Sequence, residues 1–424
     1  MNPEISVLPN KGSVKISNKP APGSPLRALL YSHDSWGLGH LRRSLAIARE
    51  ITNHSEQANV LVVTGSPVAT QFDLPERCDV LKLPAVSKDQ DGQYISRQLS
   101  GSIASTIELR RRLIQESYRS FDPHLIIVDH QLTGLHDEAL GMLREAKDQN
   151  KLLIYGMRDV IDAPERVAPA WDSAEHRWAL KHAYDRICVY GTPGVFDPRV
   201  QYKALESLRH KIEFTGYIVT PLSKTNRQPV PSFRKKVLVT MGGGEDGAER
   251  IEAYIDALLV SPVHWDSHIV TGPLMDQVRV RHFKRRIYRH GLADQVRISR
   301  FLPNLPRLLQ ESDAVVSMAG YNSCAEIMQS GVAAVLMPRC HPRKEQLIRA
   351  RRLEEMGLAQ CVVGENPADI RKAVESALDK PDTKSQVPSL DGLGRLCSII
   401  GELLGSEKDQ FQSCDAGQLK IAAD

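Results

Sequence analysis

The chain repeats one pattern twice: short apolar runs alternate with longer segments of helical periodicity. The runs lack the alternating polarity of a strand with one face in water, so they predict strands buried on both sides of a parallel sheet. They cover residues 28–31, 60–63, 125–128, 152–155 and 187–190 in the first half, and residues 237–240, 268–271, 296–299, 314–317, 333–337 and 360–363 in the second. The pattern therefore predicts an α/β fold with two doubly wound, Rossmann-like domains.

A proline-rich break separates the two halves. Residues 221–231 hold three prolines and show no periodicity, which is typical of a linker. Two domains joined in this way predict a cleft between them. The expected organisation is a flexible tail, a first domain, a linker, a second domain and a second flexible tail, at residues 1–25, 26–220, 221–233, 234–405 and 406–424.

Composition excludes several classes of protein. Hydrophobic residues make up 42% of the chain, too much for an intrinsically disordered protein. No run of about 18 apolar residues predicts a membrane-spanning helix. With 55 Lys and Arg against 51 Asp and Glu, the net charge is only +4, and no recognition motif is present, so nucleic acid is not expected as a partner.

Cysteine usage and the N-terminus bear on the compartment. The seven cysteines are odd in number and never in C-x-x-C spacing, which argues against a zinc site or a disulfide framework and fits a reducing compartment. Residues 1–25 are polar and lack the apolar core of a signal peptide. We therefore expect a cytoplasmic protein.

The carboxyl end of the first strand carries a candidate catalytic residue, since ligands of open parallel sheets bind at such strand ends. Gly37, Gly39 and His40 lie there, directly before a helix expected over residues 41–51. The glycines permit a tight turn close to a ligand, and the helix N-terminus offers free N–H groups. His40 would act as a general base in the cleft, or would only cap the helix; the spacing leaves both interpretations open.

A glycine turn also follows the first strand of the second half. Gly242, Gly243 and Gly244 suit close approach of the backbone to an anion, although a plain tight turn is the alternative. No Lys-Ser or Lys-Thr pair follows these glycines, which excludes a Walker-type ATPase.

Residues 317–331 form the most informative segment. Gly320 permits a turn whose amides make a second anion site, and Asn322 and Ser323 are natural caps for the helix that follows. Glu326 lies one turn into that helix, where its carboxylate could reach the hydroxyls of a sugar or ribose. Gly331 is expected to end the helix.

Together these residues resemble the GT-B fold glycosyltransferases, in the group that contains the lipid-linked GlcNAc-transferase of peptidoglycan synthesis and relatives with a family-28-like C-terminal domain. The resemblance covers residues 26–401 and rests most on the pattern Phe301-Leu-Pro-Asn304, Ser312-Asp313, Ser317-Met-Ala-Gly320, Glu326, Gly331, Pro338 and Glu345-Gln346. It implies that residues 26–220 form the acceptor-side domain and that residues 234–405 bind a nucleotide sugar.

The resemblance also implies roles for single residues. It implies that the donor diphosphate lies against Gly242, Gly243 and Gly244, and that a second phosphate-facing turn is formed by Gly320, Tyr321, Asn322 and Ser323. It implies that Glu326 holds the ribose and that Glu345 and Gln346 hold the hydroxyls of the donor sugar. Phe301 is implied to pack beside the base. Gly37, Gly39 and His40 match the N-terminal loop and its histidine, the usual candidate base. The family's fuller glycine run is absent here, which puts the family's acceptor in doubt.

Two more strand ends of the first half carry charged side chains. Asp129 could orient His40 or simply neutralise a nearby arginine, and both interpretations stay open. His130 is expected to be a helix cap or surface residue rather than a base. Arg158, beside Asp159, is assigned to the acceptor side.

Two basic runs, residues 279–290 and residues 110–112, allow two interpretations. A solvated helix face is the favoured one for the first run. A patch that touches anionic lipid headgroups is the alternative, and residues 110–112 permit the same two interpretations.

The sequence and the resemblance together predict an inverting glycosyltransferase that needs no metal and no other cofactor. No D-x-D motif stands at the end of any of the strands expected above, so backbone amides and helix N-termini would stabilise the leaving diphosphate. The expected partners are a nucleotide-diphosphate sugar, most often UDP-linked in this group, and a hydroxyl acceptor. The resemblance allows this acceptor to be lipid-linked, in cell-envelope or exopolysaccharide synthesis, with peripheral contact at the inner face of the membrane. A nucleotide-sugar hydrolase or epimerase, and a non-enzymatic sugar-nucleotide binder, are the alternatives.

Overall fold

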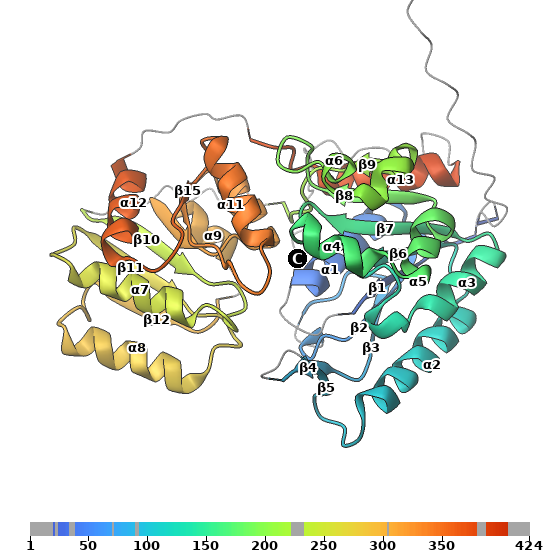
Figure 1. Cartoon of the computed structure of the whole chain (residues 1–424), viewed down its shortest axis with the longest axis horizontal. Coiled ribbons are helices and arrows are strands. Elements are labelled where there is room, and N and C mark those ends of the chain that lie inside the picture. The colour runs from blue at the N-terminus through green and yellow to red at the C-terminus, as the bar shows by residue number, and fades with distance from the viewer. Residues whose placement is uncertain are drawn as a thin grey trace, which may run out of the picture.

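The computed structural model describes residues 20–21, 24–33, 39–69, 72–89, 93–221, 233–302, 305–379 and 387–405. These residues form two domains that stand side by side, the first coloured blue to green and the second yellow to orange in Figure 1. Several predicted features lie outside the described residues: Gly37, most of the N-terminal tail, linker residues 222–232 and residues 406–424.

The first domain is built on a seven-stranded parallel sheet in the order β3-β2-β1-β6-β7-β8-β9. Its central strand β6 is buried along its whole length, which explains why the strand consists of one apolar run. The bounds are β1 (Arg27–Ser32), β2 (Asn59–Thr64), β3 (Cys78–Lys82), β6 (Leu125–Asp129), β7 (Leu152–Arg158), β8 (Arg186–Tyr190) and β9 (Ile212–Phe214), with a separate hairpin of β4 (Val86–Lys88) and β5 (Tyr94–Ser96).

The second domain repeats this design on a six-stranded parallel sheet in the order β12-β11-β10-β13-β14-β15. The two sheets confirm the predicted doubly wound α/β fold. The bounds are β10 (Lys235–Thr240), β11 (Trp265–Val270), β12 (Val296–Ser299), β13 (Ala314–Ser317), β14 (Ala333–Leu336) and β15 (Gln360–Cys361).

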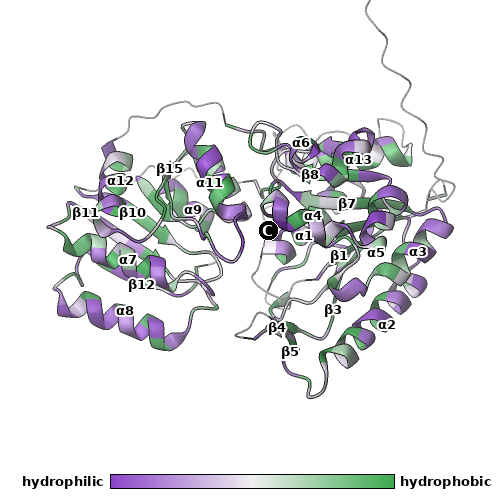
Figure 2. Ribbon diagram, in the orientation of Figure 1, coloured by the Kyte–Doolittle hydropathy of each residue, from purple (hydrophilic) through white to green (hydrophobic). Residues whose placement is uncertain are grey.

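Helices cover both faces of each sheet. In Figure 2 the outer helices α2 and α8 carry both hydrophilic and hydrophobic residues, because one side of each packs on the sheet and the other faces water. None of the helices in the described part of the chain is both long enough and apolar enough to cross a membrane. The bounds are α1 (Gly39–His54), α2 (Ile103–Phe121), η2 (Leu135–Asp137), α3 (Leu140–Asp148), α4 (Pro164–Trp171), α5 (Ala174–Trp178), η3 (Ala179–Ala183), α6 (Pro198–Gln201), η4 (Lys203–Lys211), α7 (Ala248–Leu259), α8 (Gln277–Arg289), α9 (Leu305–Gln310), α10 (Tyr321–Ser330), α11 (Glu345–Glu355), α12 (Pro367–Asp379) and α13 (Gly392–Leu404).

Helix α13 follows the second domain in the chain but packs on the first, where Figure 1 shows it in red. Leu396 and Ile400 of α13 share a buried core with Leu45 and Ala48 of α1. The predicted range 234–405 thus includes one helix that covers the other domain, while the remaining domain boundaries stay predictions.

The strand order places the functional edge of each sheet. From β1 the chain first adds β2 and β3 on one side and then returns to add β6 on the other. In the same way it adds β11 and β12 on one side of β10 and then β13 on the other. Ligands of doubly wound sheets bind where the order reverses, outside the carboxyl ends of the strands. The residues that follow β1, β6, β10 and β13 are therefore the ones to examine.

Candidate functional site

A cleft of about 320 Å³ opens where these strand ends of the two domains meet. The first domain contributes the start of α1 and the end of β7, and the second contributes the turns after β10 and β13 and the start of α10. The predicted site residues that line it are Gly39, His40, Arg158, Gly242, Gly243, Phe301, Gly320, Tyr321, Asn322, Ser323 and Glu326. Gly244, Glu345 and Gln346 are not among its lining residues. The structure thus gathers most of the predicted residues, and their roles stay predictions.

His40 is held from behind by Asp129 at the end of β6. Its Nδ1 lies 2.5 Å from Oδ2 of Asp129. Arg43, one turn further along α1, donates to the same carboxylate through Nη2 (2.6 Å) and Nε (3.1 Å). The carboxylate therefore makes both contacts that the two interpretations require, one to the histidine and one to an arginine, and its role in orienting His40 stays a prediction.

The charge on Asp129 assigns the proton on His40. Burial disfavours that charge, but the Arg43 guanidinium and His40 outweigh burial and hold the pKa of Asp129 well below its usual range. Nη2 of Arg43, which can only donate, also lies 2.8 Å from Nδ1 of His40, but the carboxylate oxygen is closer, at 2.5 Å, and can only accept. We therefore assign the hydrogen to Nδ1, facing Asp129, which leaves a free lone pair on Nε2. This is the tautomer that a general base requires.

Two more imidazoles surround His40. The ring of His130 lies 5.1 Å and that of His33 lies 5.3 Å from the His40 ring, measured between centroids. The expectation that His130 is a cap or surface residue is wrong, because its left-handed backbone (φ 70°) at the end of β6 leaves the side chain buried. His33, buried directly after β1, was not predicted; its position at a strand end was its only signal.

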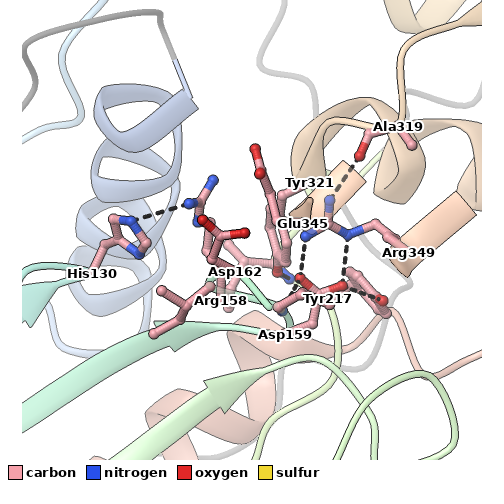
Figure 3. A network of polar contacts seen from close by, with 12 residues as sticks. His130, Arg158, Asp159, Asp162, Tyr217, Ala319, Tyr321, Glu345 and Arg349 are labelled. Atoms are coloured by element: carbon pink, nitrogen blue, oxygen red, sulfur yellow. Dashed lines mark hydrogen bonds and ion pairs between the residues drawn. The ribbon is translucent and has the colours of Figure 1, made fainter. Parts of the chain in front are cut away.

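Several nitrogen atoms around these imidazoles are buried without a hydrogen-bond partner. Nη2 of Arg158 donates to Nε2 of His130 (3.1 Å, Figure 3), so the hydrogen of a neutral His130 lies on Nδ1. That nitrogen, Nδ1 of His33 and Nε of Arg158 are buried and have no hydrogen-bond partner among the described residues. Burial lowers the pKa of both histidines well below the usual value, and burial with neighbouring arginines lowers that of Arg158 to about 10.

The glycine turn after β10 divides into two parts. Gly242 has a φ of 63° and open space where a side chain would begin, and Gly243 beside it also lines the cleft. Gly244, predicted to approach the donor, instead lies against Thr271 and Met275, so close packing is what requires a glycine there. Of the three glycines, Gly242 and Gly243 line the cleft and Gly244 does not.

The turn after β13 begins α10 without a side-chain cap. Gly320 is the N-cap residue, so the predicted capping by Asn322 and Ser323 is wrong. Asn322 instead donates from Nδ2 to the carbonyl of Gly39 in the other domain (3.1 Å). The helix ends, as predicted, at Gly331 in the left-handed conformation (φ 72°).

Glu326 faces the cleft from the first turns of α10 and is mostly buried. Its Oε1 accepts a hydrogen bond from Nη2 of Arg42. Arg42 was not among the predicted site residues. Phe301 lies in the same cleft, half-exposed. Tyr321 is buried there, and its hydroxyl accepts from the backbone nitrogen of Ile218 (2.9 Å).

Glu345 and Gln346, predicted to hold the donor sugar, are buried at the start of α11. Oε1 of Glu345 accepts from Nη2 of Arg339 (2.6 Å), and Oε1 of Gln346 accepts from the backbone nitrogen of Arg339 (2.9 Å). Oε2 of Glu345 has no hydrogen-bond partner among the described residues, and its carboxylate appears near Arg158 in Figure 3. A sugar contact at this position stays a prediction.

The basic runs do not form one surface. Arg110 is fully buried and binds Glu138 through Nε and Nη2 (2.5 and 2.6 Å), so neither interpretation given for residues 110–112 applies to it. On α8, Arg286 pairs with Glu252 and Asp256 of α7. These pairs agree with the favoured interpretation of that run as a solvated helix face.

A buried ion pair joins the two domains beside the cleft (Figure 3). Arg349 of α11 donates to both oxygens of Asp159, through Nε (2.8 Å) and Nη2 (2.5 Å), and to the carbonyl of Ala319 through Nη1 (2.7 Å). Tyr217 donates to the same carboxylate (2.8 Å). Both side chains of the ion pair are fully buried, so the pair fixes one domain against the other.

Metal ligands do not gather in the described part of the chain. Among these residues no group of three or more His, Cys, Asp or Glu side chains could hold a metal ion. In the cluster of His33, His40 and His130, the imidazole of His130 accepts a hydrogen bond from Arg158, and the positive charge of this guanidinium would repel a cation.

Comparison with known proteins relates this geometry to others. Residues 269–389 match the glycosyltransferase family 28 C-terminal domain. The chain is 24% identical over 395 residues to the UDP-N-acetylglucosamine–N-acetylmuramyl-(pentapeptide) pyrophosphoryl-undecaprenol N-acetylglucosamine transferase of Leuconostoc citreum, an alignment that covers 88% of this chain and 97% of that one. The sequence resemblance seen above thus extends over most of the chain.

Solved structures show the same GT-B fold. The calicheamicin glycosyltransferase CalG4 superposes with a TM-score of 0.58 at 17% identity, over 90% of this chain and 99% of its own. The UDP-GlcNAc 2-epimerase of Methanocaldococcus jannaschii superposes with a TM-score of 0.57 at 12% identity, over 89% and 99%. Transferases and an epimerase are equally close, so the fold alone does not choose between them.

Proposed function

We propose that this protein is an inverting glycosyltransferase that moves a sugar from a nucleotide-diphosphate donor, UDP-linked, to a hydroxyl acceptor without a metal ion. One observation carries the proposal: the cleft sets a histidine–aspartate pair of one domain opposite two glycine turns of the other. The family 28 match of residues 269–389 and the relative that uses UDP-N-acetylglucosamine support the same donor class.

The second domain would bind the donor. Backbone N–H groups of Gly242, Gly243 and the uncapped start of α10 would take the diphosphate, and the dipole of α10 would stabilise its charge. Glu326 would accept from the ribose hydroxyls, with Phe301 beside the base. As the bond to the sugar breaks, the electron pair goes to the diphosphate oxygen, which these donors hold in place.

The first domain would supply the base. Nε2 of His40 takes the proton of the acceptor hydroxyl while the hydroxyl oxygen bonds to the anomeric carbon from the face opposite the diphosphate, so the configuration inverts. Asp129 keeps Nδ1–H in place and stabilises the imidazolium, which later gives its proton to water.

The acceptor would lie along the unpaired donors of the first domain. Nε–H of Arg158 and Nδ1–H of His130 are unpaired donors next to His40, which suits an acceptor that carries a phosphate or carboxylate. This agrees with a lipid-linked acceptor bound at the inner face of the membrane by a cytoplasmic enzyme of cell-envelope or exopolysaccharide synthesis.

A sugar-nucleotide hydrolase or epimerase is the second candidate. The epimerase neighbour superposes as well as the transferase does, and the cleft imidazoles could equally act on water or on the donor sugar. A binder without turnover is the remaining alternative. The three differ in their products, so one assay separates them.

The test combines binding and turnover. Sugar nucleotides are screened by melting temperature, where a ligand at 100 times its Kd adds about 2.7 kcal/mol, and the binders are assayed for nucleotide release with and without candidate acceptors. We expect His40→Ala to bind the donor normally and to lose turnover about a hundredfold. His282→Ala, an exposed histidine on α8, is the matched control. Nucleotide release that is equally fast without an acceptor would favour the hydrolase, and an epimerised donor would favour the epimerase. Binding without turnover would favour the binder. If no sugar nucleotide binds, the proposal is contradicted.

A further inference from the structure

Two helix N-termini face each other across the cleft. Helix α1 begins at Gly39 and α10 at Tyr321, and the hydrogen bond from Asn322 to the carbonyl of Gly39 joins them. Each helix start carries a partial positive charge, and no side chain caps α10. This end of the cleft is therefore positive before any side-chain charge is counted.

Arg42 adds a full positive charge at the same place. It projects from the first turn of α1, and 38% of its side chain is exposed. Its partner Glu326 is the one carboxylate among the described residues that line the cleft, whereas Arg42, Arg43 and Arg158 all line it. Because Asp129 already binds Arg43, Glu326 is the carboxylate left to balance Arg42.

This pairing conflicts with the role proposed for Glu326. A ribose offers two neighbouring hydroxyls, and a carboxylate holds both in its simplest arrangement with one hydroxyl on each oxygen. In the structure Oε1 already accepts from Arg42, whose guanidinium takes space beside that oxygen. The ribose hydroxyls of a bound nucleotide therefore compete with Arg42 for Oε1.

We propose that Arg42 changes partner when the donor binds: the ribose hydroxyls take Glu326, and the guanidinium moves to the diphosphate between the two helix N-termini. The inference rests on the proposed function. A guanidinium binds phosphate oxygens through two parallel hydrogen bonds, and a half-exposed arginine is free to swing within one cleft. Arg42 thereby selects nucleotides that carry a diphosphate and, while none is bound, keeps Glu326 paired.

The exchange has a signature that a structural bridge lacks. Without Arg42, uridine meets a free Glu326 and binds more tightly, whereas UDP loses a charged partner and binds more weakly. A charge-assisted hydrogen bond corresponds to a change of about tenfold in affinity. We expect Arg42→Ala to lower the Kd for uridine about threefold and to raise the Kd for UDP about tenfold.

Calorimetric titration with uridine and with UDP tests this on the full chain. The proteins are wild type, Arg42→Ala, Arg42→Lys and the control Arg112→Ala, which also breaks an arginine–glutamate pair but lies exposed on α2. Arg42→Lys keeps the charge and should lose less UDP affinity than Arg42→Ala. Melting temperatures without ligand confirm that each variant is folded, and a loss of folding in Arg42→Ala leaves Arg42→Lys and Arg42→Gln to carry the comparison.

The outcomes separate the two proposals. Opposite shifts for uridine and UDP support partner exchange. Shifts in the same direction, or an unchanged Kd for UDP, overturn it and leave the proposed function standing. If wild type binds neither compound, nor any other nucleoside diphosphate or its sugar, the proposed function itself fails.

Discussion

Loss of the ion pair between Asp159 and Arg349 should destabilise the whole molecule. Both side chains are fully buried, and Arg349→Met would remove two hydrogen bonds to the carboxylate and one to Ala319. Tyr217 and the backbone nitrogen of Val160 would remain as donors to an uncompensated charge. Breaking a buried pair costs about 3–5 kcal/mol, and we expect the lower end because these two donors stay.

The assay is the free energy of unfolding in urea, with calorimetry to show whether the domains unfold together. Arg352→Met is the control, since Arg352 also bonds across the domains, to the carbonyl of Gly194 (2.8 Å), but is exposed and should lose less than about 1 kcal/mol. The double variant Asp159→Asn, Arg349→Met should regain part of the loss. A loss in Arg349→Met no larger than that of the control would refute the reasoning.

The same pair predicts a dependence on pH. Burial disfavours the charge on Asp159, but Arg349 outweighs it and lowers the pKa of the folded carboxyl below its usual value. The unfolded chain then binds the proton first as pH falls, so the stabilisation is present above about pH 4 and is lost as pH falls further. The difference in stability between wild type and Arg349→Met should therefore narrow as pH falls below about 4.

Three further predictions concern the cleft. Asp129→Asn should lower kcat about a hundredfold with little change in donor KM, because the neutral amide no longer stabilises the imidazolium and can place an N–H donor against Nδ1 of His40, which favours the wrong tautomer. An unchanged kcat would exclude this role of Asp129. Gly242→Ala should raise the donor KM about tenfold. The control is Gly291→Ala after α8, where φ is 66° and the space is also open; this variant should lose stability through backbone strain of about 1–2 kcal/mol, as Gly242→Ala does, but should leave the donor KM unchanged. The pKa of His130 in the folded protein lies well below its unfolded value, so the unfolded chain binds the proton first and stability falls as pH drops below about 6.5. His130→Asn should reduce the slope of stability against pH by up to about 1.4 kcal/mol per pH unit. Identical slopes in wild type and variant would count against a neutral His130.

The sequence was sufficient for the fold where burial is complete. Residues 125–128 form one apolar run, and β6 is buried on both faces. The two edge strands of the first sheet were missed for the converse reason: β3 is half-exposed and includes Asp79 and Lys82, and β9 spans only Ile212–Phe214. A strand covered on one side or only three residues long leaves no such run.

The site was predictable as far as it depends on strand ends. That rule located His40, Gly242 and Gly320 before their contacts were known, because parallel strands end at one edge of the sheet. It could not supply the partners of these residues. Arg42 and Glu326 are separated by 284 positions, and Asp159 and Arg349 by 190, so no local pattern relates them.

Charge patterns were the least informative. Arg110 belongs to a run of three arginines that suggests a solvated surface, yet it is buried against Glu138, which lies 28 residues away. Its two neighbours pair with Glu108 and remain on the surface. Which arginine of a run is buried depends on which face of the helix packs on the rest of the domain. That packing is a tertiary contact, so the run itself does not predict it.

Because α13 lies on α1, the polypeptide crosses between the two domains twice, once between Pro221 and Phe233 and once between Asp379 and Gly392. A single truncation of the chain therefore cannot yield either domain complete and alone. A fragment that stops at residue 220 would bare the side of α1 that Leu396 and Ile400 cover, and would be prone to aggregate. Domain swaps with related enzymes should therefore carry the last helix along with the first lobe.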